Sequence, residues 1–237
     1  MAPANPIKLY DSGTCPFAQR AWIALVEKQL PFEVIKVDLQ NKPQHFVDKY
    51  HEINPDPNSA AKVPILIDGG NQLIESSLVV EYLEDKYPDQ GASLLPEDPF
   101  QRAKVRLFVD FFNNNFQPLQ YKLLRAGSEQ EVSELKEQLQ SVLVNLDKFL
   151  QWHAEGSSGF FLADYGFAET ITTPFLRRAL LNLPAYRGID VLKLVKAHRL
   201  ARLESWIKAS LERPSNLSTG PTDEEVVANH KKFVTQF

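Results

Sequence analysis

The N-terminal part of this chain alternates strand and helix patterns, and this order limits the fold more than any other feature of the sequence. Residues 7–10 (IKLY) predict a short strand, and residues 15–29 (CPFAQRAWIALVEKQ) have helical length with Pro16 in the first turn. Residues 32–39 (FEVIKVDL) alternate and are rich in β-branched and aromatic side chains, which indicates a second strand. A strand–helix–strand start gives a parallel pair joined by a right-handed crossover.

The same region continues with a helix, a loop, a hairpin and a last helix. Its order is therefore β-α-β-α-β-β-α, which predicts a thioredoxin-like α/β domain over residues 1–88. Ser76 or Ser77 is placed to cap the last helix. The segments are a helix at 42–53, a loop rich in proline and asparagine at 54–62, strands at 63–67 and 71–75 around the turn DGG, and a helix at 76–87.

The second part of the chain carries only helical patterns. Residues 87–99 (YPDQGASLLPEDP) contain three prolines and a glycine, and we expect the linker at 89–98. Residues 134–150 show a stripe of apolar residues with helical spacing, and residues 191–211 repeat this spacing. Residues 222–233 have acidic residues at their start and lysines near their end, an order that the helix dipole favours. Residues 99–237 are therefore expected to form an all-α domain that contains a second-substrate pocket.

Composition excludes several classes of function. The net charge of -4 gives no general attraction to nucleic acid or anionic lipid, and no stretch approaches the roughly 20 apolar residues of a membrane span. The first residues lack the pattern of a secretory signal. One cysteine rules out an internal disulfide framework and any multi-cysteine metal site. We expect a reduced cytoplasmic protein without a metal, a nucleic-acid partner or a membrane partner.

That one cysteine, Cys15, is the first candidate for chemistry. If Pro16 begins the helix, Cys15 is its N-cap, and the amides of Phe17 and Ala18 face the sulfur. Cysteines at helix N-termini have pKa values of roughly 3.5–7.5, against about 8.5 for a free thiol. Because position 18 is alanine, there is no C-x-x-C pair, and a mixed disulfide formed here needs a second thiol from outside, such as glutathione. The alternatives are a small buried hydrophobic residue and a Cys–His protease.

Two further stretches fit a site for a peptide-like thiol. A cis Val63–Pro64 peptide would expose the Val63 backbone to a ligand, although proline also begins ordinary strands. Glu75 and Ser76 stand at the mouth of a helix, where an N-terminus binds carboxylates and Glu75 would face an ammonium group. An ordinary helix cap is the alternative reading of that pair.

In its motifs the sequence resembles the soluble glutathione transferases, and among them the cysteine-type classes omega and lambda. The motifs are CPFAQR at 15–20, NKP at 41–43, KVP at 62–64 and ES at 75–76, in the family's order and spacing. The resemblance implies that glutathione is the co-substrate and that Cys15 is the nucleophile. It further implies that the Phe17 amide lies beside the thiol and that Lys42 approaches the glycyl carboxylate of glutathione. Val63 would pair with the cysteinyl part through its backbone, with Pro64 cis. Glu75 would bind the γ-glutamyl ammonium, and Ser76 would bind the carboxylate of that group.

A cysteine in this family implies thiol transfer, deglutathionylation and dehydroascorbate reduction, with a small disulfide or electrophile as second substrate. Omega relatives are dimers and lambda relatives are monomers, so both states stay open. Two alternatives use the same fold: a non-enzymatic binding or interaction protein, and a protein like the chloride intracellular channels.

The C-terminal part departs from the family in one motif. The family's capping box appears here as GFAE, with Gly166 at the cap and Glu169 three residues later, so only half of the box is expected to form. Residues 106–121 and the segment around Trp206 are the candidates for the second-substrate pocket, although aromatic side chains such as theirs are more often core than pocket residues.

Overall fold

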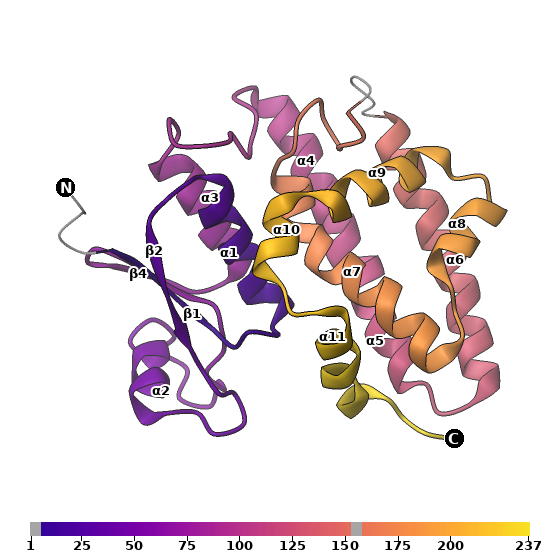
Figure 1. The fold of residues 1–237 in the computed structure, drawn as a ribbon, viewed down its shortest axis with the longest axis horizontal. Helices are drawn as coiled ribbons and strands as arrows, with labels where there is room; N and C mark the ends of the chain where they lie inside the picture. The colour runs from indigo at the N-terminus through magenta and orange to yellow at the C-terminus, as the bar shows by residue number, and fades with distance from the viewer. Residues whose placement is uncertain (1–5, 153–157) are drawn as a thin grey trace. The chain divides into compact units, whose positions relative to one another are not determined.

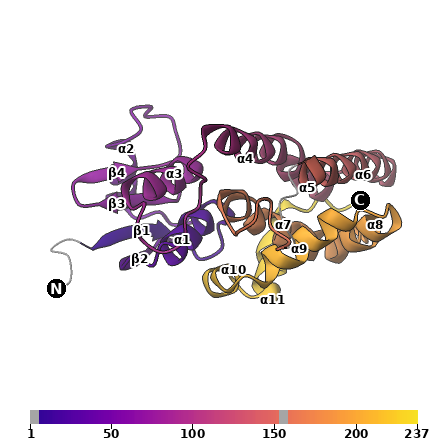
Figure 2. The same ribbon diagram turned by 90° about the horizontal axis from the view of Figure 1, so that it is seen from above.

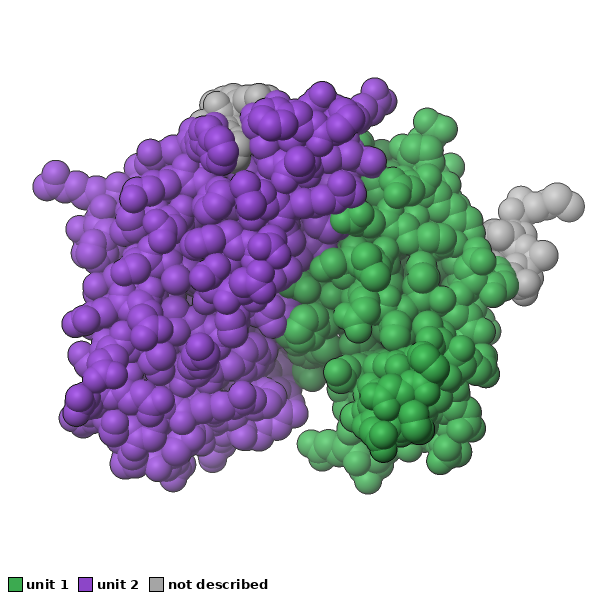
Figure 3. All heavy atoms as spheres, turned by 180° about the vertical axis from the view of Figure 1, so that it is seen from behind, with its two compact units in different colours: residues 1–94, 218–220 green, residues 95–217, 221–237 purple. Residues whose placement is uncertain are grey.

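The computed structural model describes residues 6–152 and 158–237, which divide into two compact units (Figure 1, Figure 3). Unit 1 takes residues 1–94 with 218–220, and unit 2 takes residues 95–217 with 221–237. The first division falls inside residues 89–98, which remain our proposed linker. Residues 1–5, at which we expect no secretory signal, lie outside the described residues.

Unit 1 is built on a four-stranded mixed sheet with the strand order β2-β1-β3-β4. β1 is parallel to β2 and antiparallel to β3, and β3 and β4 form the hairpin. This is a thioredoxin-like arrangement, and it confirms the predicted order β-α-β-α-β-β-α. The elements are β1 (Ile7–Asp11), α1 (Pro16–Glu27), β2 (Phe32–Lys36), α2 (Gln44–His51), β3 (Ile65–Asp68), β4 (Asn71–Leu73) and α3 (Ser76–Lys86).

Helices cover both faces of this sheet. α1 and α3 lie side by side (Figures 1 and 2). On the other face, Phe46 and Tyr50 of α2 pack into a core cluster with Tyr10 and Ile65, and the ring of Phe46 is 5.9 Å from that of Tyr10. Since successive residues of a strand point to opposite faces, the fully buried Leu9 of β1 faces the side opposite Tyr10.

The start of α3 differs from the expected cap. Glu75, not Ser76 or Ser77, occupies the N-cap position, and Ser76 is the first helical residue. The reason is the backbone of Glu75, whose φ of 67° turns the chain into the helix one residue before a serine cap could form. Glu75 makes no side-chain cap hydrogen bond.

The segment after α3 is held against the end of α1. The amide of Ala92 donates to the Glu27 carbonyl at 2.9 Å, and the fully buried Lys28 pairs with Glu84 at 2.9 Å. Gly91 has a φ of +57°, and a Cβ placed on it would lie 2.2 Å from the Glu27 carbonyl oxygen. Part of the proposed linker is therefore packed closely on unit 1.

The described residues of unit 2 form helices joined by turns and irregular segments, with no strand among them, as expected. In Figure 2, α4, α5 and α6 form one layer, and α7, α8 and α9 lie beneath it. The elements are α4 (Pro99–Phe111), the π-helix η1 (Phe112–Phe116), α5 (Gln117–Arg125), α6 (Glu129–Trp152), α7 (Phe167–Arg187), α8 (Val191–Ala197), α9 (Ala201–Glu212), α10 (Pro214–Thr219), α11 (Asp223–His230) and the 3₁₀ helix η2 (Lys231–Phe233).

The periodic stretch at 191–211 forms two helices, α8 and α9, where its pattern suggested one. The chain breaks at Arg199, whose φ of 56° lies in the left-handed region and cannot continue a helix. The new N-terminus at α9 is capped from a distance, because Asp147 of α6 accepts a hydrogen bond from the Leu203 amide at 2.7 Å. The local N-cap residue is Leu200, which has no polar side chain to do this.

Glu169, at the start of α7, joins three parts of unit 2. It is 1% exposed, and its carboxylate accepts hydrogen bonds from the Phe161 amide at 2.7 Å, the Gly166 amide at 3.1 Å and the Trp206 indole at 2.8 Å. Burial raises the pKa of Glu169, against the opposing effect of these donors. Gly166 has no side chain to accept a hydrogen bond, so only the Glu169 half of the capping box forms, as expected. Glu169 also binds Phe161 and Trp206, which a capping residue need not do.

Trp206 belongs to this core. Its side chain is fully buried, and its ring packs edge-to-face on Phe108 with the centroids 5.4 Å apart. Aromatic side chains of this candidate segment are more often core than pocket residues, and Trp206 lies in the core, where its indole N–H donates to Glu169.

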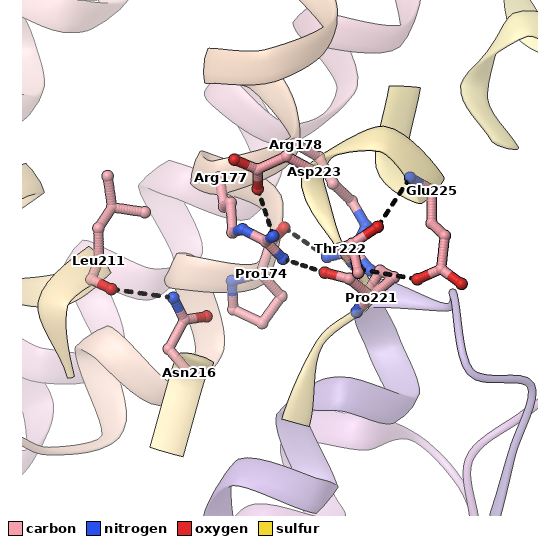
Figure 4. Close-up of polar contacts among 9 residues, drawn as sticks. All are labelled: Pro174, Arg177, Arg178, Leu211, Asn216, Pro221, Thr222, Asp223 and Glu225. Atoms are coloured by element: carbon pink, nitrogen blue, oxygen red, sulfur yellow. Dashed lines mark hydrogen bonds and ion pairs between the residues drawn. The ribbon is translucent and has the colours of Figure 1, made fainter. Parts of the chain in front are cut away.

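The beginning of α11 is fastened to α7 (Figure 4). Arg177 donates to the Pro221 carbonyl at 2.8 Å and pairs with Asp223. Thr222 and Glu225 form a reciprocal capping box, with the Glu225 amide 3.2 Å from the threonine oxygen and the Thr222 amide 2.8 Å from the glutamate. The acidic start predicted for residues 222–233 is confirmed in this box.

Candidate functional site

Cys15 lies where the sequence places it, between β1 and α1. It is the N-cap of α1, with extended backbone angles, and Pro16 is the first helical residue. Its sulfur is 3.9 Å from the carbonyl oxygen of Val63. The predicted side-chain cap is not formed, because the thiol points to this carbonyl as a donor.

The turn before Cys15 is held by Asp11. This carboxylate is 2% exposed and accepts hydrogen bonds from the Gly13 amide at 2.6 Å and from Lys36 at 2.8 Å. Gly13 has a φ of 80°, a backbone angle that glycine adopts readily and residues with a side chain rarely adopt. Lys36 also lies 4.5 Å from the centre of the Trp22 ring. The end of β1 and the start of α1 are therefore fixed together around the cysteine.

Two small cavities of unit 1 contain all seven residues that the sequence predicted for the site. They share Phe17, Lys62 and Val63. One cavity, of about 260 Å³, is lined by Phe17, Tyr50, Lys62, Val63, Pro64, Ile74, Glu75 and Ser76. The other, of about 230 Å³, is lined by Cys15, Phe17, Leu39, Lys42, Ala60, Ala61, Lys62 and Val63. We call them the α3 cavity and the thiol cavity.

The α3 cavity contains the two unusual backbone features of the site. The Val63–Pro64 peptide is cis, which confirms that expectation. Glu75 combines a φ of 67° with a ψ of 101°, an uncommon conformation for a residue with a side chain. Its side chain is exposed, whereas Ser76 beside it is 5% exposed. A strained backbone such as that of Glu75 is typical of ligand sites.

Charge is distributed unevenly along the two cavities. Lys42 lines the thiol cavity, Lys62 lines both, and Glu75 lines the α3 cavity. A ligand that carries a carboxylate at one end and an ammonium group at the other fits this order of charges. In the described ranges 6–152 and 158–237, no group of three or more histidine, cysteine or acidic residues is arranged to hold a metal ion.

The sequence reasoning missed the two lining residues with a polar or charged side-chain group that lie outside the predicted set, Lys62 and Tyr50. Lys62 was quoted only as part of the KVP motif, yet it is the one cation that both linings share. Tyr50 was assigned only to a helix; its hydroxyl lies 3.3 Å from Ser59 and accepts from Asn54 at 3.2 Å. The helical spacing of Tyr50 from Phe46 marks it as a core residue, and no pattern marks its hydroxyl as part of the loop before the site.

Comparison with known proteins identifies the family. Residues 9–91 match the model of the glutathione S-transferase N-terminal domain. Rat glutathione S-transferase omega-2 is 30% identical over 192 residues, which cover 74% of this chain and 73% of the rat protein. This chain belongs to the glutathione transferase superfamily. Pig glutathione S-transferase omega-1 is 29% identical to this glutathione transferase over 218 residues, covering 90% of the chain and 80% of the relative.

Solved structures agree with this family assignment. Glutathione transferase Omega 3C of Trametes versicolor superposes with a TM-score of 0.77 at 28% identity, covering 93% of this chain and 91% of the fungal one. Rice GST1, solved in complex with glutathione, superposes with a TM-score of 0.78 at 25% identity over 96% of this chain and 97% of the rice one. The transferase is therefore omega-like. None of its helices within the described residues has the length and apolar character needed to cross a membrane.

Proposed function

We propose that this glutathione transferase is a thiol transferase that uses Cys15 as its nucleophile. The observation that carries the proposal is the position of Cys15, at the N-terminus of α1 and in the lining of the thiol cavity. A helix N-terminus favours the thiolate over the thiol, and the thiolate is the reactive form. The absence of a cysteine at position 18 means that a second thiol must resolve any disulfide formed here.

The reaction takes place in two exchange steps. The Cys15 thiolate attacks the glutathionyl sulfur of a mixed disulfide, which forms a Cys15–glutathione disulfide and releases the substrate as a thiolate. The thiolate of a second glutathione then attacks the glutathionyl sulfur, which yields oxidised glutathione and restores Cys15. For each glutathione mixed disulfide that is reduced, one free glutathione thiol is consumed and one molecule of oxidised glutathione is formed, whereas reduction of one dehydroascorbate consumes two glutathione thiols.

The rest of the predicted set binds glutathione in this proposal. Lys42, with Lys62, faces the glycyl carboxylate, and the Val63 backbone pairs with the cysteinyl part. Glu75 binds the γ-glutamyl ammonium, and Ser76 binds the carboxylate of that group. The order of charges along the two cavities supports this orientation, as does the glutathione complex of the similar rice protein.

The same proposal covers the compartment, the second substrate and the oligomeric state. A catalytic thiol without a partner cysteine works in a reducing compartment, which favours the cytoplasm. The second substrate is a small disulfide or electrophile. The oligomeric state stays open between a homodimer and a monomer.

Turnover tests the proposal. The full chain is assayed with a glutathione mixed disulfide of a small thiol and with an aromatic conjugation substrate. We expect rapid reduction of the mixed disulfide and little conjugation. Binding of glutathione without turnover of the disulfide would contradict the proposal and favour the non-enzymatic alternative.

A further inference from the structure

Lys36, the last residue of β2, contacts the segments on either side of Cys15. Its ammonium group is 2.8 Å from the Oδ2 atom of Asp11, the residue opposite it in the pairing of β1 with β2. The same ammonium group lies 4.5 Å from the centre of the Trp22 ring on α1. These two contacts hold the end of a side chain that is otherwise 58% exposed.

Asp11 brings a negative charge close to the thiol. Its Oδ2 atom accepts from the Gly13 amide at 2.6 Å as well as from Lys36, and its side chain is 2% exposed. Gly13 comes two residues before Cys15, and two residues of chain span at most about 7 Å. The carboxylate is therefore within roughly 13 Å of the sulfur, and its burial limits the screening of its charge by salt.

The charges around the thiol act in opposite directions. A cation near a cysteine favours the thiolate, which is the reactive form, and a carboxylate disfavours it. The N-terminus of α1 favours the thiolate, and so do Lys42 and Lys62 in the lining of the thiol cavity. Arg20 of α1 faces the Phe17 ring of the same lining and acts in this direction too. The carboxylate of Asp11 opposes these groups.

We propose that Lys36 is a positioning residue for the exchange reaction, which neutralises Asp11 so that this carboxylate holds the turn before Cys15 without disfavouring the thiolate. The inference rests on the proposed function, because it takes Cys15 as the nucleophile. It adds a residue that lines neither of the two cavities and that acts through Asp11. Arginine should be able to replace Lys36, since either cation can pair with the carboxylate and lie over the Trp22 ring.

The test measures the rate at which iodoacetamide alkylates the full chain, across the pH range in which the protein stays folded. Because the chain has a single cysteine, the rate reports on Cys15 alone. For Lys36→Met we expect the midpoint of alkylation to move to higher pH by about 0.3–1 pH unit, as for an unpaired negative charge about 10 Å from the sulfur. Below the midpoint, alkylation should be about two- to tenfold slower than in the wild type. Lys36→Arg should keep the wild-type midpoint.

Substitution of Asp11 separates the effect of charge from that of structure. Asp11→Asn removes the negative charge but keeps a side-chain oxygen that can accept from the Gly13 amide, and it should move the midpoint to lower pH. The double variant of Asp11→Asn with Lys36→Met has neither charge, so its midpoint should lie between those of the single variants, near that of the wild type. Lys8→Met is the matched control and should leave the midpoint unchanged, because Lys8 pairs with Glu33 at 3.9 Å across the same two strands.

The pH profile of disulfide exchange gives a second readout. Below the alkylation midpoint, Lys36→Met should exchange more slowly than the wild type. Well above the midpoints of both proteins the two rates should agree, because Cys15 is then a thiolate in each of them. A variant that had merely lost the shape of the turn would be slower at every pH.

The outcomes separate this inference from the proposed function. An unchanged midpoint in Lys36→Met overturns the inference, and so do midpoints that rise in both single variants, since that pattern marks a turn that has lost its support. If the wild type catalyses no exchange, the proposed function fails, whereas the alkylation of the variants still tests the compensation of charge. Should Asp11→Asn not fold, as judged by its melting temperature, Lys36→Met and Lys36→Arg decide. Equal midpoints in these two variants would then overturn the inference.

Discussion

The sulfur of Cys15 lies 3.9 Å from the carbonyl oxygen of Val63, although 48 positions separate the two residues in the chain. This contact joins the N-terminus of α1 to the segment that leads into β3. A ligand whose backbone pairs with Val63 would therefore hold its own sulfur close to the cysteine. The arrangement brings peptide recognition and thiol chemistry to one place in unit 1.

Replacing Cys15 by serine should abolish disulfide exchange and leave the fold almost unchanged. A serine cannot form the mixed disulfide, but it is a good N-cap residue, so the melting temperature should stay within a few degrees of the wild type. Exchange activity and thermal unfolding are measured on the same preparation. Residual exchange at more than a small fraction of the wild-type rate would show that Cys15 is not the nucleophile.

Replacing Glu75 by glutamine should weaken glutathione binding by about tenfold, because a charge-assisted hydrogen bond to the ligand ammonium is lost. The measurement is the Kd for S-methylglutathione by calorimetry. Asp89→Asn is the matched control, since Asp89 is an exposed carboxylate of unit 1 that lines neither of the two cavities. Equal affinities of the Glu75 variant and the control would place the ligand elsewhere.

Replacing Glu169 by glutamine should destabilise unit 2 by about 1–3 kcal/mol. All three contacts of this carboxylate are accepted from N–H donors, and the new amide group would turn a donor toward one of them. Urea unfolding provides the free energy of unfolding, and Glu204→Gln on the surface of α9 is the control. If the free energy of unfolding falls no further in this variant than in the control, the hydrogen bonds of Glu169 make no net contribution to stability.

Alanine should be far more harmful at Gly91 than at Gly69, although both glycines have a positive φ. At Gly69, with a φ of +63° and no atom within 4 Å of the added Cβ, only the left-handed backbone costs energy, about 1–2 kcal/mol. At Gly91 the Cβ would also meet the Glu27 carbonyl oxygen at 2.2 Å, and overpacking adds about 1–3 kcal/mol. Equal melting temperatures of the two variants would contradict the close packing of this loop on α1.

Unit 1 should become less stable as the solution becomes acidic, because protonation of Asp68 removes the stabilisation that its carboxylate provides. Burial raises the pKa of its carboxyl, but hydrogen bonds from Lys86, Tyr87 and Tyr82 outweigh burial and hold the pKa below its ordinary value of 3.8. Because the pKa is depressed in the folded state, the stabilisation is complete above pH 3.8 and is lost as the pH falls toward the folded-state pKa.

This pH dependence is checked by unfolding wild type and Asp68→Asn at a series of acidic pH values. The difference in free energy of unfolding between the two should shrink below pH 3.8. In Lys86→Met the shrinkage should be smaller and should be complete at a higher pH, because the ammonium group that lowers the folded-state pKa of Asp68 is missing. A difference that does not change with pH would contradict the assignment.

Patterns that repeat along the chain could be predicted, and contacts between distant residues could not. The order of elements in unit 1 follows from alternating side chains, proline and glycine, and Pro16 marked Cys15 as the N-cap. The bond from Arg20 to Ser76 spans 56 positions and follows no local rule. The break at Arg199 is equally unmarked, since its periodic pattern continues on both sides.

Polar residues in the core were the hardest to place. Asp147 sits in the apolar stripe of α6 and reads as an ordinary surface acid, yet it is 3% exposed and caps α9. Trp206 lies in a segment that was a pocket candidate, because aromatic side chains occur in cores and in pockets, and its complete burial and its bond to Glu169 place it in the core.

The most direct test of the central claim is intact-mass analysis of the full chain during reaction with a glutathione mixed disulfide. Because the chain has a single cysteine, any glutathionyl adduct must be on Cys15. We predict one adduct that forms at least as fast as turnover and disappears when reduced glutathione is added, and none in Cys15→Ser. Turnover without an adduct, or an adduct that reduced glutathione does not remove at the rate of turnover, would contradict the role of Cys15 as the nucleophile.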